Sequence, residues 1–224
     1  MYTRPFFQPD RAASLGFAAA RGFGTVCAFD GTRPVASALP FCLEYLSDGT
    51  PVAAFHVARG NALAALADGK SRWLIAVNGV DAYVSPHWYA SPDQVPTWLY
   101  RAVHLTGTVR KQSDDELGRH LDALSAKFES WLAPKPPWLS SKMTAGRLEA
   151  MKKAIVGLVM TIEDVEGSFK LNQQKSEADY AAVANGLAAM PDHGSQTIAQ
   201  LMRETRPQAF ASTSNETASL EGSM

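Results

Sequence analysis

The sequence predicts an α+β protein built around a closed β-barrel of mostly antiparallel strands. Short apolar segments between residues 23 and 112 repeat with a period of two, as half-buried strands do. Gly, Asn and Asp residues that favour turns separate these segments, which is typical of antiparallel barrels. In the second half of the chain, apolar residues recur at helical spacing. With 224 residues, 46% of them hydrophobic, the chain can bury a sizeable core.

The first predicted elements are a helix and a hairpin. Residues 9–22 are rich in alanine, which favours a helix. The period of two then predicts strands over residues 23–29 and 33–46, joined by a two-residue turn at Asp30 and Gly31. On the second strand, one face would carry Val35, Ser37, Leu39, Phe41, Leu43 and Tyr45.

The two cysteines of the chain are Cys27 and Cys42. In the predicted hairpin, Cys27 lies opposite Pro34, which is eight residues before Cys42 on the partner strand. At about 3.3 Å per residue, this separation exceeds the reach of a disulfide. We therefore expect two reduced, buried thiols.

The remaining elements alternate between strands and helices. Strands are predicted over residues 51–57, 72–79, 81–85 and 97–112, with a short helix at 61–68 and a turn at Asn78 and Gly79. Ser113 and Glu116 form a capping-box pattern that begins a helix. Further helices are expected over residues 141–153 and from Ser176, with a strand over 154–167 between them.

The domain organisation follows from where the apolar residues stop. Residues 1–206 are predicted to form a single domain with C-terminal helices. Residues 207–224 have little to bury and are predicted to form a mobile tail.

The overall charge limits the partners of the protein. A formal net charge of −1 argues against the broad basic surface that nonspecific DNA binding requires, so any contact with nucleic acid would be local. No uninterrupted apolar run is long enough to span a membrane, and the first residues lack the apolar region of a secretion signal. The sequence therefore predicts a cytoplasmic protein with no membrane partner.

Common catalytic and metal-binding motifs are absent from the sequence. There is no G-x-S-x-G segment, P-loop or G-x-G-x-x-G segment, which weakens hydrolase and Rossmann interpretations. No histidine pair has the spacing of a helical zinc site, and no Cys/His cluster occurs. We therefore predict neither a metal site nor a catalytic residue.

Two segments could instead bind a ligand. Arg59 and Gly60 lie between a predicted strand and a helix that begins near Asn61, an arrangement that suits an anion. The alternative is a capped helix beside a solvated arginine. Residues 81–100 are rich in tyrosine and tryptophan, and could form a core, the wall of a pocket for a flat ligand, or a subunit contact. His104 would share a strand face with some of these rings, either as a buried histidine or as a cofactor contact.

Five segments occur in a fixed order: ALPF (38–41), HVARGN (56–61), AYVSPHWY (82–89), VPTWLYRAVHLTG (95–107) and KLNQQK (170–175). Together they resemble the signature blocks of the PaiB-type family, which is described as FMN-binding negative transcriptional regulators. The resemblance implies a flavin-reductase-like split β-barrel of about six to eight mostly antiparallel strands with flanking helices. It also implies FMN as cofactor and a homodimer with the flavin in a groove between the subunits.

The resemblance further implies a set of cofactor-binding residues. On the phosphate side, the candidates are Ser37, Arg59 and Asn61. On the ring side, the candidates are Trp88, Trp98, Tyr100 and His104. His56, in the same segment as Arg59, completes the predicted cofactor-binding set.

Three functions are compatible with these observations. The first is a flavin-binding regulator without turnover, whose DNA partner is implied by the resemblance alone. The second is an FMN-dependent oxidoreductase or flavin reductase, in which the cofactor carries the redox chemistry. The third is haem binding, with His56, His87 and His104 as candidate axial ligands. The sequence leaves open whether the protein is an enzyme.

Overall fold

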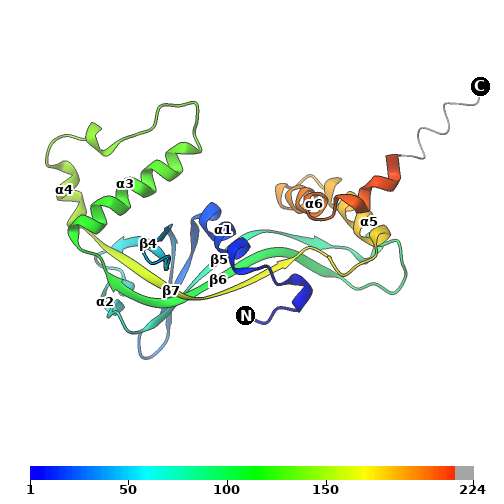
Figure 1. Cartoon of the computed structure of the whole chain (residues 1–224), viewed down its shortest axis with the longest axis horizontal. Helices are drawn as coiled ribbons and strands as arrows, with labels where there is room; N and C mark the ends of the chain where they lie inside the picture. The colour runs from blue at the N-terminus through cyan, green and yellow to red at the C-terminus, as the bar shows by residue number, and fades with distance from the viewer. Residues whose placement is uncertain (215–224) are drawn as a thin grey trace, which may run out of the picture. The chain divides into compact units, whose positions relative to one another are not determined.

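The computed structural model describes the backbone of residues 1–214 and the side chains of residues 1–211 (Figure 1). The chain divides into two compact units. We call residues 11–77 and 103–166 the barrel unit, and residues 1–10, 78–102 and those from 167 onward the helical unit. Three long strands continue from one unit into the other. That residues 1–206 act as one domain stays a prediction.

Seven strands and ten helical segments follow one another along the described chain. The strands are β1 (Phe23–Phe29), β2 (Pro34–Pro40), β3 (Cys42–Tyr45), β4 (Pro51–Ala58), β5 (Arg72–Val84), β6 (Thr97–Lys111) and β7 (Ile155–Lys170). The α-helices are α1 (Arg11–Arg21), α2 (Ala62–Leu66), α3 (Asp114–Ser130), α4 (Arg147–Lys152), α5 (Glu177–Ala188) and α6 (His193–Thr205). Short 3-10 helices are η1 (Pro5–Phe7), η2 (Pro86–Trp88), η3 (Ser140–Lys142) and η4 (Pro207–Ser214).

The strands form one sheet in the order β2-β1-β5-β6-β7-β4-β3. The pairs β1–β2, β1–β5, β3–β4 and β4–β7 are antiparallel. Strands β2 and β3 lie at opposite ends of this order, yet only Phe41 separates them along the chain. One residue cannot cross the width of a flat seven-stranded sheet, because neighbouring strands are about 4.8 Å apart. The sheet must therefore curl until its edges meet, and the predicted barrel is confirmed.

The single strand predicted over residues 33–46 is wrong. Pro40 ends β2, since proline has no N–H to donate to a neighbouring strand. Phe41 is completely buried, and its N–H donates a hydrogen bond to the carbonyl of Gly22 over 2.8 Å. The chain then continues as β3, which pairs with β4 and forms the other edge of the sheet.

The predicted hairpin register is also wrong. The loop has four residues, so Phe29 pairs with Pro34 and Cys27 with Ala36. The Asp30 carboxylate widens the turn by accepting hydrogen bonds from the backbone N–H groups of Thr32 and Arg33, each over 2.9 Å. Both cysteines are free thiols, as expected, with Cys42 buried and Cys27 half-buried.

The turn predicted at Asn78 and Gly79 does not form, because β5 runs through both residues. A two-residue hairpin turn requires positive φ angles. Positive φ occurs at five glycines of the described chain, and Gly79 is not among them. Its backbone is extended, and the two predicted strands are one.

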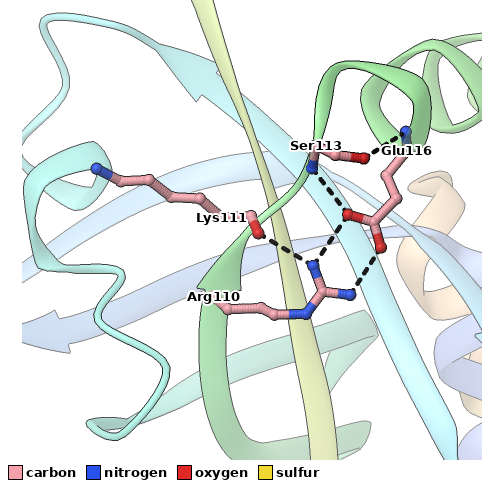
Figure 2. Close-up of polar contacts among 4 residues, drawn as sticks. All are labelled: Arg110, Lys111, Ser113 and Glu116. Atoms are coloured by element: carbon pink, nitrogen blue, oxygen red, sulfur yellow. Dashed lines mark hydrogen bonds and ion pairs between the residues drawn. The ribbon is translucent and has the colours of Figure 1, made fainter.

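The first turn of α3 forms as predicted (Figure 2). The Ser113 hydroxyl accepts from the Glu116 N–H, and the Glu116 carboxylate accepts from the Ser113 N–H over 2.8 Å. Arg110 donates to both oxygens of the same carboxylate, over 2.7 and 3.0 Å. These bonds hold the pKa of Glu116 at about 2 and fix the end of β6 against the start of α3.

Two helical predictions need correction. The helix predicted over residues 141–153 shortens to α4, because Gly146 takes a left-handed φ of 76° immediately before it. Helix α6 was missing from the prediction, although Asp192 caps it and Ile198, Ala199 and Met202 bury one face. The tail predicted from Pro207 begins as η4, in which Ala209 is buried, and its residues 215–224 lie outside the described chain.

Each unit has its own buried core. In the barrel unit, the largest fully buried side chains are Trp73, Phe41, Phe55, Leu63, Ile75, Leu105, Leu158 and Met160. In the helical unit, α5 and α6 pack together around Tyr180, Val183, Leu187, Ile198 and Met202. Between residues 1 and 214, every helix is too short or too polar to cross a lipid bilayer.

Candidate functional site

The structure brings together two of the predicted phosphate-side residues. Asn61 caps α2, and its Oδ1 accepts a hydrogen bond from the Leu63 N–H over 3.0 Å. The Nδ2 of the same side chain donates to the Ser37 hydroxyl on β2 over 2.9 Å. Both side chains are half-buried. The amide thus joins the second strand to the loop that follows β4.

Arg59 immediately follows β4, and its side chain binds the backbone at the start of β7. Its Nε donates to the Lys153 carbonyl over 2.8 Å, and its Nη2 donates to the Ile155 carbonyl over 3.2 Å. The guanidinium is nevertheless exposed and lines a cavity of about 400 Å³, which we call the Arg59 cavity. Charged residues of its lining are Arg59, Lys111, Lys152 and Lys153 against Asp114 and Glu149. The cavity therefore carries a net positive charge.

His56, also predicted from the sequence, pairs with a histidine that was not. Its Nδ1 lies 3.1 Å from Nε2 of His120 on α3, and the two rings meet edge to face. His120 is only 2% exposed, and its Nδ1 has no hydrogen-bond partner among the described residues. Burial lowers the pKa of His56, while burial and the neighbouring His56 lower the pKa of His120 to about 4. Both rings are therefore held neutral near pH 7.

The histidine pair borders two cavities of the barrel unit. His56 lines one of about 540 Å³, whose apolar walls come from Leu121, Trp138, Met143, Leu148 and Met151. His120 lines a smaller one of about 230 Å³. A sequence signal for His120 did exist, since it lies three residues after Leu117, on the buried side of an amphipathic helix.

The predicted ring-side residues divide between the two units. Trp88, Trp98 and Tyr100 belong to the helical unit, whereas His104 and all the phosphate-side candidates belong to the barrel unit. Trp98 is 54% exposed and packs edge to face against Tyr83, with ring centroids 5.9 Å apart. Trp88 is half-buried against Gly186 of α5, where a Cβ would meet the indole ring at 2.7 Å.

The other two ring-side candidates lie on β6. Tyr100 is half-buried and lines a separate cavity of the helical unit. His104 is half-buried, and burial lowers its pKa. The aromatic segment thus supplies a core side chain in Tyr89, an exposed ring in Trp98 and a cavity wall in Tyr100.

Residues 1–164 match the family described as "Putative FMN-binding domain". The chain belongs to this family. It is also 31% identical to Protease synthase and sporulation protein PAI 2 of Bacillus subtilis, over 91% of this chain and 97% of that protein. The resemblance to the PaiB-type family is therefore confirmed, and the family is described as binding the predicted cofactor, FMN.

Solved structures agree on the fold. An FAD and heme binding protein from Mycobacterium smegmatis is 21% identical with a TM-score of 0.53, over 79% of this chain and 80% of that chain. The flavocytochrome Anf3 from Azotobacter vinelandii is 15% identical with a TM-score of 0.55, over 80% of this chain and 78% of that chain. At these identities the likeness concerns the fold, and it confirms the predicted α+β split barrel.

Proposed function

We propose that this protein binds FMN and acts as a flavin-containing regulator of the PaiB type. The observation that carries the proposal is the family match over residues 1–164, which includes every proposed phosphate-side residue. FMN supplies one- and two-electron redox chemistry when it is bound. The residues discussed next bind and orient it.

The barrel unit offers groups that fit a flavin phosphate. The Asn61 amide and the Ser37 hydroxyl meet at one place, and the hydroxyl accepts in their shared bond, which leaves its hydrogen for another acceptor. Arg59 has remaining N–H donors beyond the two bonds it makes to backbone carbonyls. Since the Arg59 cavity is net positive, a phosphate placed at this end of β4 gains favourable electrostatic energy.

The ring-side assignment is part of the same proposal. Trp88, Trp98, Tyr100 and His104 are proposed to contact the isoalloxazine ring, with some of them coming from a partner subunit. A large exposed indole such as Trp98 favours an interface role, because tryptophan is enriched where proteins bind partners. We propose a homodimer on this basis, and sedimentation at low micromolar concentration tests it.

The test compares FMN with riboflavin, which lacks the phosphate. In fluorescence titrations, the wild-type protein should bind FMN at least tenfold more tightly than riboflavin. Asn61→Asp retains the α2 cap, because Asp and Asn cap helices about equally well. It removes the amide donor and places a negative charge beside the phosphate.

Asn61→Asp should therefore lower FMN affinity at least tenfold while riboflavin affinity changes less than threefold. Ser176→Ala, which removes the cap of α5, serves as the control and should leave both affinities unchanged. Equal loss of FMN and riboflavin binding in Asn61→Asp would contradict the phosphate assignment. No saturable binding of either flavin by the wild type would contradict the proposed function itself.

Measuring the oxidation of NADH and NADPH distinguishes a regulator from an oxidoreductase. With saturating FMN, the protein should oxidise NADH and NADPH no faster than free FMN does. A clear protein-dependent rate would instead favour the oxidoreductase. DNA binding, if local, should appear as a shift of promoter fragments that disappears with added salt.

A further inference from the structure

The helical unit contains a cavity of about 400 Å³ that the flavin proposal does not use, except for Tyr100 on its wall. We call it the Lys170 cavity. It lies among the N-terminal residues, the start of β6 and the end of β7, and its lining includes Arg4, Tyr89, Tyr100, Lys170, Asn172 and Lys175. We propose that this cavity is a binding site for a small aromatic anion, that is, a phosphate or carboxylate attached to a flat ring.

The charge of the lining points to an anion. Arg4, Lys170 and Lys175 line the cavity, and no aspartate or glutamate does. The Lys170 ammonium donates to the Thr97 hydroxyl over 2.6 Å, and the Lys175 ammonium donates to the Gln94 side-chain carbonyl over 2.5 Å. Both partners are neutral. In residues 1–211 no carboxylate forms an ion pair with any of the three cations.

The cations that line the cavity repel one another unless an anion binds between them. Burial and the neighbouring Arg4 lower the pKa of Lys170, as expected for an ammonium group that faces another cation. A bound phosphate or carboxylate would accept hydrogen bonds from these groups and offset their repulsion. The Thr3 hydroxyl oxygen is buried at the same cavity and has no partner among the described residues, so a ligand oxygen could bond to it.

The turn that presents the lysines is held rigidly. Asn172 adopts a left-handed φ of 62°, is 1% exposed, and donates to the Tyr89 hydroxyl over 3.1 Å. The Gln173 side chain accepts from the Leu171 N–H over 2.8 Å. From the end of α6, Arg206 donates to the Lys175 carbonyl over 2.8 Å. Strained backbone that neighbours over-determine in this way is typical of ligand sites.

The walls of the cavity suit a flat ring. Tyr89 is 9% exposed, and the Lys175 ammonium lies 4.9 Å from the centre of its ring. Tyr100 and Phe7 add further aromatic surface. Aromatic pairs prefer offset or edge-to-face contacts, which a planar ligand can make with such walls. The volume lies within the range of about 300 to 1,000 Å³ that small-molecule sites occupy.

The geometry also accounts for the KLNQQK segment, which gave no catalytic or flavin-binding interpretation. Its first and last lysines supply two of the cations, and the residues between them fix the spacing of those lysines. The lining of this site shares one side chain, Tyr100, with the proposed flavin residues. Lys170 and Lys175, whose variants test this site, are not among the flavin residues, so the two proposals can fail independently.

The test uses phenyl phosphate as the probe, with the full-length protein saturated with FMN. Isothermal titration should give saturable binding at one site per chain. Lys170→Met and Lys175→Met, which keep length but remove charge, should each weaken phenyl phosphate binding about tenfold, the cost of one charge-assisted bond. Lys70→Met removes an exposed lysine of the barrel unit and should have no effect. Lys175→Arg should stay within about twofold of the wild type.

Further comparisons identify the chemistry of the ligand. Inorganic phosphate should bind at least tenfold more weakly than phenyl phosphate, because it makes no ring contact. FMN affinity should be unchanged in Lys170→Met and Lys175→Met, and phenyl phosphate affinity unchanged in Asn61→Asp. The proposal is overturned by an absence of saturable binding, by equal affinity in Lys70→Met and the two cavity variants, or by displacement of phenyl phosphate by FMN.

Discussion

The buried histidine pair predicts an unusual sensitivity of stability to acid. His120 has a folded-state pKa of about 4, against an ordinary value of 6.5. One pKa unit corresponds to about 1.4 kcal/mol. Protonation of His120 in the unfolded chain therefore lowers the free energy of unfolding by about 3 kcal/mol. The unfolded chain binds more protons between these two pKa values, so the free energy of unfolding falls as pH drops from about 6.5 toward 4. Such a loss is a large fraction of the 5 to 15 kcal/mol of a typical domain.

The variant that isolates this effect is His120→Gln, whose amide does not titrate. Glu116 lines the same cavity as His120, and its pKa of about 2 keeps it ionised between pH 7 and pH 4. All other acidic groups are present in both proteins. We expect the stability of the wild type to fall by about 3 kcal/mol more than that of His120→Gln between about pH 7 and pH 4, because only the wild type carries the depressed pKa of His120, whereas His56 is present in both proteins.

The assay is urea unfolding at several pH values, followed by tryptophan fluorescence, to which the buried Trp73 contributes. His87→Gln, at an exposed position, is the matched control and should follow the wild-type pH dependence. Parallel stability curves for the wild type and His120→Gln would refute the assignment of a depressed pKa to His120. A constant offset between them would report only the packing cost of the substitution.

Two further predictions concern the barrel unit. Ser113→Ala should lower the free energy of unfolding by about 1 kcal/mol, because it removes one half of the capping box of α3; an unchanged urea midpoint would contradict this. Gly107→Ala should lower the free energy of unfolding by about 1 to 3 kcal/mol, because a Cβ there would collide with the backbone carbonyl of Thr161 on the adjacent β7. Gly60→Ala is the control, because a Cβ there meets no atom, and it should lower the free energy of unfolding less than Gly107→Ala does. Gly31→Ala is less suitable as a control, because the positive φ of Gly31 itself disfavours alanine.

Local patterns in the sequence were enough to predict most strands and the start of α3. The capping box at Ser113 and Glu116 forms as predicted because both partners lie within four residues of each other. The break at Phe41 could not be predicted from alternation, since Pro40 and Phe41 continue the period of two. What ends β2 there is the absence of an N–H on Pro40 and the hydrogen bond from Phe41 to Gly22.

The candidate site was predictable only in part. Ser37 and Asn61 were identified from a family resemblance, and their hydrogen bond across 24 residues depends on the barrel closing. His120 was missed because its partner, His56, lies 64 residues away, and no local spacing signals such a pair. The Lys170 cavity depends likewise on residues from three distant segments. The KLNQQK segment and the aromatic stretch stood out in the sequence, but nothing signalled that the N-terminal residues would join them.

Equilibrium dialysis of the purified protein against FMN tests the central claim most directly. Flavin should accumulate on the protein side to a saturable level at micromolar concentration, and riboflavin should accumulate at least tenfold less at the same free concentration. Equal flavin on both sides of the membrane, up to high micromolar FMN, would contradict the claim that this barrel holds a flavin by its phosphate.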